Sequence, residues 1–121
     1  MRRLLSDAAG GDPDMNSKRK GNAGELELLH LLESAGLNAH RNQQGYIGGM
    51  DNPDVALDAG GERYHLEIKR TERFSLYPAM DQAERDANGH AVPVVVHRSN
   101  RKPWVCVLRL ADFLRLVNKA P

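Results

Sequence analysis

Two carboxylates and a lysine have the spacing of a catalytic site on a pair of strands. Asp54 opens the segment PDVALDA, while Glu67 and Lys69 lie in the segment ERYHLEIKR. Side chains alternate between the two faces of a strand, so Glu67 and Lys69 point to one side and Ile68 to the other. If the two segments pair through the double glycine between them, Asp54 lies across from the end that carries Glu67 and Lys69.

This arrangement suits metal-dependent hydrolysis of a phosphodiester bond. The carboxylates of Asp54 and Glu67, together with the backbone carbonyl of Ile68, would be oxygen ligands of the kind that Mg²⁺ prefers, and Mn²⁺ can substitute. A lysine ammonium beside them, Lys69, can orient an attacking water or stabilise charge that develops on the phosphate. The alternative is that Glu67 and Lys69 are an ordinary ion pair on a solvated strand face.

The elements that must position these residues can be predicted from periodicity and turn signals. Leucines at helical spacing before Gly36 predict a first helix. A glycine pair joins two strands as a hairpin, and β-branched runs predict two later strands. The expected order is helix 21–35, strands 37–41, 53–59 and 62–70, helix 78–87, strands 91–98 and 104–110, and helix 111–119. This order predicts an α/β domain with a mixed central sheet flanked by helices.

Length and composition favour one intracellular domain. The chain has 121 residues, which suits a single domain at 17–121 after a flexible arm at 1–16. The one cysteine, Cys106, cannot form an internal disulfide, and its apolar neighbours predict a buried position. No apolar stretch approaches the ~20 residues that span a bilayer, and MRRLL has no apolar region behind it. We therefore expect a soluble, cytoplasmic protein, either near the nucleoid or, if phage-encoded, in the host cytoplasm.

The separate motifs together resemble a known nuclease family. The pattern PD…EIK resembles the signature of the PD-(D/E)XK nuclease superfamily. The opening KRKGNAGELELLHLLESAGLNAHR and the strand LEIKRT are more closely similar to archaeal-type Holliday junction resolvases and their phage relatives. The resemblance covers about residues 17 to 117, and the order and spacing of the motifs carry most of it. It implies a restriction-endonuclease-like fold.

Site residues follow from this resemblance position by position. Asp54 and Glu67 resemble the family's direct metal ligands, and Lys69 resembles its catalytic lysine. Glu25 resembles a helix glutamate that completes the metal site, directly or through water. Two alternatives stay open, because Asp51 competes with Asp54 and Glu27 competes with Glu25.

Basic residues on either side of the motif are expected to contact DNA. Arg41 resembles a residue near the DNA backbone, and Gln82 resembles one that supports the site. The residues expected at the DNA are Lys18, Arg19, Lys20, Arg41, Arg70, Gln82 and Arg98. His65 shares the strand face of Glu67 and could lie near the site, but the sequence favours a structural or surface role for it.

The resulting functional hypothesis is a Mg²⁺-dependent endonuclease that resolves Holliday junctions. Symmetric cutting of a four-way junction needs two active sites, so a two-fold homodimer is expected. One alternative is a restriction-like or repair nicking enzyme that acts on another DNA substrate. Another is a DNA-binding module of the same fold without catalysis, although clustered carboxylates serve no purpose in binding phosphate alone.

Overall fold

The computed structural model describes residues 13–41 and 54–119, with side-chain surroundings given for Arg19 and from residue 23 onward. Its elements are α2 (Pro13–Ser34), β1 (Asn38–Arg41), β2 (Asp54–Ala59), β3 (Glu62–Arg70), α3 (Leu76–Ala87), β4 (Val92–Arg98), β5 (Val105–Leu108) and α4 (Leu110–Val117). The predicted α/β class and order of elements are confirmed. The first helix begins at Pro13 rather than residue 21, so residues 13–16 of the predicted arm are helical.

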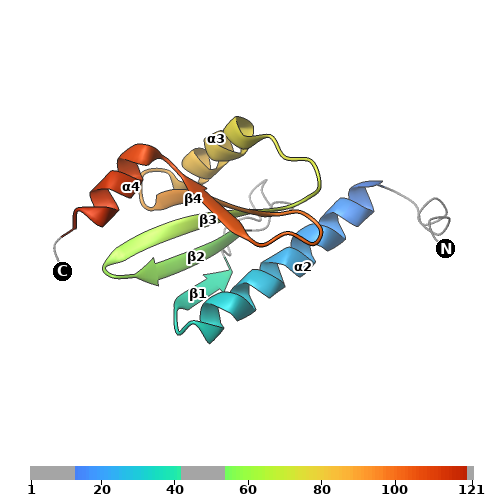
Figure 1. The fold of residues 1–121 in the computed structure, drawn as a ribbon, viewed down its shortest axis with the longest axis horizontal. Coiled ribbons are helices and arrows are strands. Elements are labelled where there is room, and N and C mark those ends of the chain that lie inside the picture. Colours follow the sequence, from blue (N-terminus) through green and yellow to red (C-terminus); the bar gives the residue numbers. More distant parts are fainter. Residues whose placement is uncertain (1–12, 42–53, 120–121) are drawn as a thin grey trace.

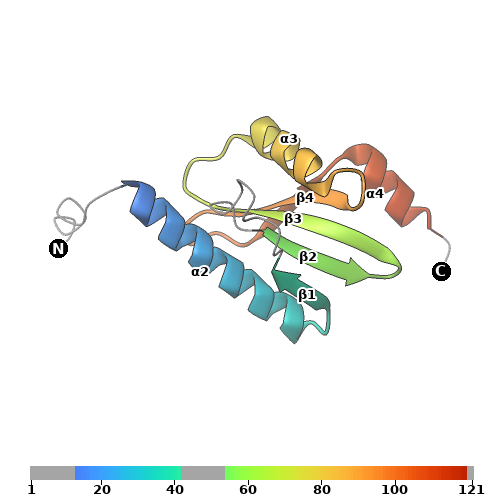
Figure 2. The same cartoon turned by 180° about the vertical axis from the view of Figure 1, so that it is seen from behind.

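The described strands form one mixed sheet in the order β1-β2-β3-β4-β5. Three neighbouring pairs are antiparallel, and β3 pairs with β4 in parallel. The parallel pair arises because α3 carries the chain back between β3 and β4, as a crossover connection requires. The sheet lies between α2 and α3, which cover opposite faces (Figures 1 and 2).

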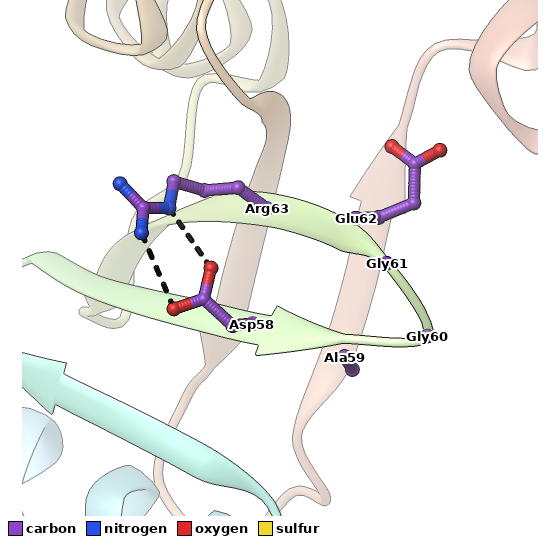
Figure 3. A pocket seen from close by; sticks show the side chains of 6 residues that line it. All are labelled: Asp58, Ala59, Gly60, Gly61, Glu62 and Arg63. Atoms are coloured by element: carbon purple, nitrogen blue, oxygen red, sulfur yellow. Dashed lines mark hydrogen bonds and ion pairs between the residues drawn. The ribbon is translucent and has the colours of Figure 1, made fainter.

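The hairpin of β2 and β3 sets the register on which the site depends. Gly60 and Gly61 both have positive φ, 58° and 81°, which favours glycine in this tight turn. Beside the turn, the guanidinium of Arg63 donates to the Asp58 carboxylate over 2.9 Å and 3.4 Å (Figure 3). The shallow hollow of about 420 Å³ at this turn lies at the opposite end of the hairpin from Asp54.

The face under α2 is an aliphatic core. Alternate residues of β2, β3 and β4 point into it and meet leucines of α2. Its buried members are Leu28, Leu29, Val55, Leu57, Leu66, Ile68, Val92, Val94 and Val96. Trp104 is half-buried against this core.

The face under α3 is different, because small residues of α3 meet polar side chains of β3. Ala79, Met80 and Ala83 pack on Val95, and Ala83 is fully buried. Alanines allow a helix to lie close to a sheet, so polar side chains of β3 are enclosed beneath α3. These enclosed polar side chains make the α3 face the candidate location of a functional site.

The prediction that Cys106 is buried is wrong, because its side chain is exposed on β5. Cys106 pairs with Val96 and so shares the sheet face that α2 covers. However, α2 packs on β1, β2 and β3, and it leaves this edge strand uncovered.

Among the described helices, none is long and apolar enough to cross a membrane.

Candidate metal centre

Asp54 and Glu67 are directly opposite each other on β2 and β3, as the hairpin prediction required. Paired residues of an antiparallel ladder share a face, and this face is the one that α3 covers. Glu67 is fully buried and Asp54 is 7% exposed. Carboxylates are almost never fully buried without a partner. The free-energy cost of burying these two carboxylates must therefore be offset by neighbouring groups or by a ligand.

The two carboxylate oxygens of Glu67 differ in their contacts within the described residues: one contacts a histidine, and the other has no hydrogen bond. Its Oε1 lies 3.1 Å from Nε2 of His65, which is also buried. Among the residues that the structure describes, its Oε2 has no hydrogen-bond partner, and it lies 4.0 Å from Nζ of Lys69. A buried carboxylate oxygen without a hydrogen bond is costly. A divalent cation bound by the two carboxylates would remove that cost, so the residues present fit a metal.

Lys69 is held in place by α3 and β4. Its Nζ donates a hydrogen bond to Oε1 of Gln82 over 2.9 Å. Nδ1 of His97 lies 2.8 Å from the backbone oxygen of Lys69, and the His97 ring stacks on Phe74 at 4.1 Å. The lysine therefore has a defined position beside Glu67, with its side chain 25% exposed.

Two further residues belong to this group, His65 from β3 and Asp86 from the last turn of α3. One ligand atom from each of Asp54, His65, Glu67 and Asp86 lies within 4.8 Å of the others. Asp86 follows Gln82 by four residues, which puts both on one side of the helix. The sequence patterns favoured a structural or surface role for His65, although its alternation with Glu67 indicated the shared face. No sequence pattern pointed to Asp86.

Glu25 reaches the site from the other face of the sheet. Its Oε1 lies 3.0 Å from Nε of Arg41, and its carboxylate lies near the backbone N–H of Asp54, which opposes the rise that burial causes in the pKa of Glu25. Glu25 is 7% exposed, and it lies outside the group of four potential ligand atoms. The position of the preceding residue, Gly24, explains the close approach. A Cβ there would lie 2.7 Å from Cβ of Arg70.

The crowding of carboxylates changes the proton affinity of the site. Burial, with repulsion from Glu67, Asp86 and Glu25, raises the pKa of Asp54 to about 6, although His65 opposes the rise. Burial also raises the pKa of Glu25 despite the Arg41 guanidinium. For His65, burial disfavours the charged ring, but Glu67, Asp54 and Asp86 outweigh it and raise its pKa.

The basic residues expected at DNA are distributed over two places. Arg70 and Arg98 are paired in register at the C-terminal ends of β3 and β4, on the α2 face. Arg70 donates to Oδ1 of Asn100 over 2.8 Å, and Arg98 donates to the backbone oxygen of Lys102 and lies over the Trp104 ring. Gln82 instead lies on the α3 face, where it binds Lys69.

The remaining predicted residues are less fully defined. Arg19 is exposed on α2. Lys18 and Lys20 belong to the same helix, but their side chains lie outside the described part. Asp51 also lies outside the described residues, so its competition with Asp54 stays open. Glu27 lies 3.6 Å from Arg98 and points away from the carboxylates, which separates it from Glu25.

The chain is similar to a solved structure of an archaeal protein. Hjc of Archaeoglobus fulgidus, an archaeal hyperthermophile, is 27% identical over a match that covers 74% of this chain and 72% of that chain, with a TM-score of 0.49. That protein is a Holliday junction resolvase. No family model matches the chain, and no curated protein matches it.

Proposed function

We propose that the chain is a metal-dependent endonuclease that hydrolyses phosphodiester bonds of DNA. The observation that carries the proposal is the Glu67 carboxylate, which is fully buried opposite Asp54 and has an oxygen without a hydrogen bond to any described residue. A protein that only bound DNA would gain nothing from two enclosed carboxylates, because they repel phosphate. We assign the activity to one domain, which comprises the predicted residues 17–121 and the start of α2 from Pro13.

Each site residue has a role in this proposal. Asp54, Glu67 and the carbonyl of Ile68 would hold Mg²⁺, or Mn²⁺ in its place, and Glu25 would contribute through water. When bound, the metal would polarise the phosphate and stabilise the leaving oxygen. Lys69, fixed by Gln82, would orient the attacking water or stabilise the developing charge. The products would carry 5′-phosphate and 3′-hydroxyl ends, as the family resemblance implies.

Branched DNA, and the four-way junction in particular, is the proposed substrate. The resemblance of residues 17 to 117 to archaeal-type resolvases supports it, since the core motif is shared by nucleases with many substrates. Arg70 and Arg98 lie at the end of the sheet to which Lys69 also belongs. They would contact the backbone of the junction arms together with Lys18, Arg19, Lys20 and Arg41.

A cleavage assay with matched variants tests this function. The purified protein is offered a four-way junction, a linear duplex, a flap and a single strand, with Mg²⁺ or with chelator. We expect paired symmetric nicks in the junction when Mg²⁺ is present and none with chelator. Lys69→Ala should keep junction binding and lose cleavage by about 10²-fold or more. Lys119→Ala, a lysine near the hairpin turn, is the control and should cleave normally.

The other outcomes are equally informative. Cleavage of plain duplex would move the assignment to a restriction-like or repair enzyme. Tight binding without cleavage by the wild-type protein, unchanged in Glu67→Ala, would identify a binding module. Full activity of Lys69→Ala would refute the proposed site.

A homodimer is the proposed assembly, and α4 offers a surface for it. Leu110, Phe113, Leu114 and Val117 are between 48% and 68% exposed, at the spacing of one helix face. Val105, on the edge strand β5, is 48% exposed as well. Apolar side chains gathered in this way are typical of protein interfaces, and a second copy would pair two active sites on one junction.

Light scattering after gel filtration measures the assembly. The wild-type protein should be a dimer, and Phe113→Asp should shift it toward the monomer and convert paired nicks into single ones. Leu31→Asp is the control: it introduces the same charge at an exposed position of α2, and this variant should stay dimeric. A dimer that persists in Phe113→Asp would show that the interface lies elsewhere.

A further inference from the structure

His65 and Asp86 extend the carboxylate pair into a four-residue cluster. Asp54, Glu67 and His65 come from the hairpin, while Asp86 comes from α3, so two separate parts of the chain converge there. Nε2 of His65 lies 3.1 Å from Oε1 of Glu67 and 3.9 Å from Oδ2 of Asp54. Ligand atoms about 2.1 Å from one ion are about 3.0 Å apart when adjacent and about 4.2 Å apart when opposite. The first distance also fits a hydrogen bond, and both lie within the range that ligand atoms of one ion span.

The environment of the cluster also points to a ligand. Three of its four members are buried, and within residues 13–41 and 54–119 the fully buried Glu67 has an oxygen without a hydrogen bond. Asp86 is exposed, and it lines a cleft of about 410 Å³ together with His65. Residues of β1 and the segment after α3, among them His40 and His90, complete the cleft. The cleft therefore opens to solvent on the side of the cluster that His65 and Asp86 form.

We propose that His65 and Asp86 are direct ligands of the catalytic metal, giving a mixed nitrogen and oxygen site that selects Mn²⁺ over Mg²⁺. The inference rests on the proposed function, because it concerns the metal that the nuclease uses. Mg²⁺ binds oxygen and keeps its waters, whereas Mn²⁺ accepts both carboxylate oxygen and imidazole nitrogen. A site with one imidazole and three carboxylates therefore favours Mn²⁺.

Binding of Mn²⁺ to the full chain, without DNA, is the measurement. Titration followed by electron paramagnetic resonance gives the affinity, and the pulsed form detects ¹⁴N of a directly bound imidazole. In the wild-type protein we expect a ¹⁴N coupling and tighter binding of Mn²⁺ than of Mg²⁺. His65→Gln, which can still donate to Glu67, should lose the coupling and weaken Mn²⁺ binding at least about tenfold. Its Mg²⁺ affinity should change much less.

Two further variants complete the design. Asp86→Asn changes an exposed helix residue, so the protein should fold; it should weaken Mn²⁺ binding and keep the ¹⁴N coupling. His40→Gln removes another imidazole that lines the same cleft, on β1, and should change neither quantity. Circular dichroism establishes that each variant is folded.

The results separate this inference from the function beneath it. Bound Mn²⁺ without ¹⁴N coupling in the wild-type protein, or a coupling that survives in His65→Gln, would overturn the role of His65. Unchanged affinity in Asp86→Asn would overturn the role of Asp86. In each of these cases, cleavage of DNA by the wild-type protein leaves the nuclease proposal standing. A wild-type protein that neither binds metal nor cleaves DNA would refute both.

Discussion

Neighbouring residues of β3 bury apolar side chains on one face of the sheet and charged or polar side chains on the other. On β3, Leu66 and Ile68 point into the aliphatic core under α2, whereas His65, Glu67 and Lys69 point under α3. Burial of the first set removes apolar surface from water and stabilises the fold. Burial of the second set costs free energy, since charges leave water and the carboxylates repel one another. The difference teaches that the α2 face stabilises the fold, whereas the α3 face carries a cost that a bound cation would offset.

The largest expected effect is on cleavage by Glu67→Gln. The substitution keeps the shape of the side chain and removes the charge that the metal needs. We expect cleavage to fall by about 10³-fold or more, comparable to loss of a principal electrostatic group in other enzymes. The free energy of unfolding should change by less than about 1 kcal/mol. Junction cleavage rates and urea unfolding measure the two quantities; a large loss of stability would mean that this face is structural.

Ile68→Ala should have the opposite effect, a large loss of stability with little loss of cleavage. Ile68 is 1% exposed in the core under α2, so its truncation leaves a cavity. The free energy of unfolding should fall by about 2–5 kcal/mol. Cleavage by the protein that remains folded at low temperature should stay within about tenfold of wild type, because the backbone carbonyl is kept. Loss of cleavage in fully folded protein would mean that the two faces are not separable.

Gly24→Ala tests how the α2 face supports the site. The added Cβ would meet Cβ of Arg70, which cannot rotate away, so α2 must shift. We expect a loss of about 1–3 kcal/mol in the free energy of unfolding. Weaker cleavage should accompany it, because Glu25 would lose its contact with the N–H of Asp54. Ala23→Ser, at the exposed preceding position, is the control. Equal stability of both variants would contradict the close approach.

The smallest expected effect is on stability in the absence of metal. The raised pKa values of Asp54, about 6, and of His65 mean that the folded state binds protons more tightly than the unfolded chain. The free energy of unfolding in chelator should therefore fall as pH rises from 5 to 8, by about 1–2 kcal/mol. Asp54→Asn should flatten the lower part of that fall. Stability that rises over this range would contradict the buried charges.

Much of the architecture could be predicted from the sequence. The leucine spacing of the first helix, the double glycine of the hairpin and the valine run of β4 each specify a local structure. Period-two alternation also put Glu67 and Lys69 on one face, and the hairpin put Asp54 across from them. The start of α2 was misplaced by eight residues, because PDMNSKRK has no apolar period although it is helical.

What the sequence by itself determined is therefore local: the strand pair, its register, and the identity of Asp54, Glu67 and Lys69 as one group. Only the tertiary structure decided which helix covers which face. It brought Asp86 to Glu67 and Gln82 to Lys69, gave Arg41 to Glu25, and left Cys106 uncovered on β5. The physical reason is that alternation and turn geometry act between near neighbours. The packing of α2 and α3 depends on side-chain volumes over the whole sheet, which no local pattern records.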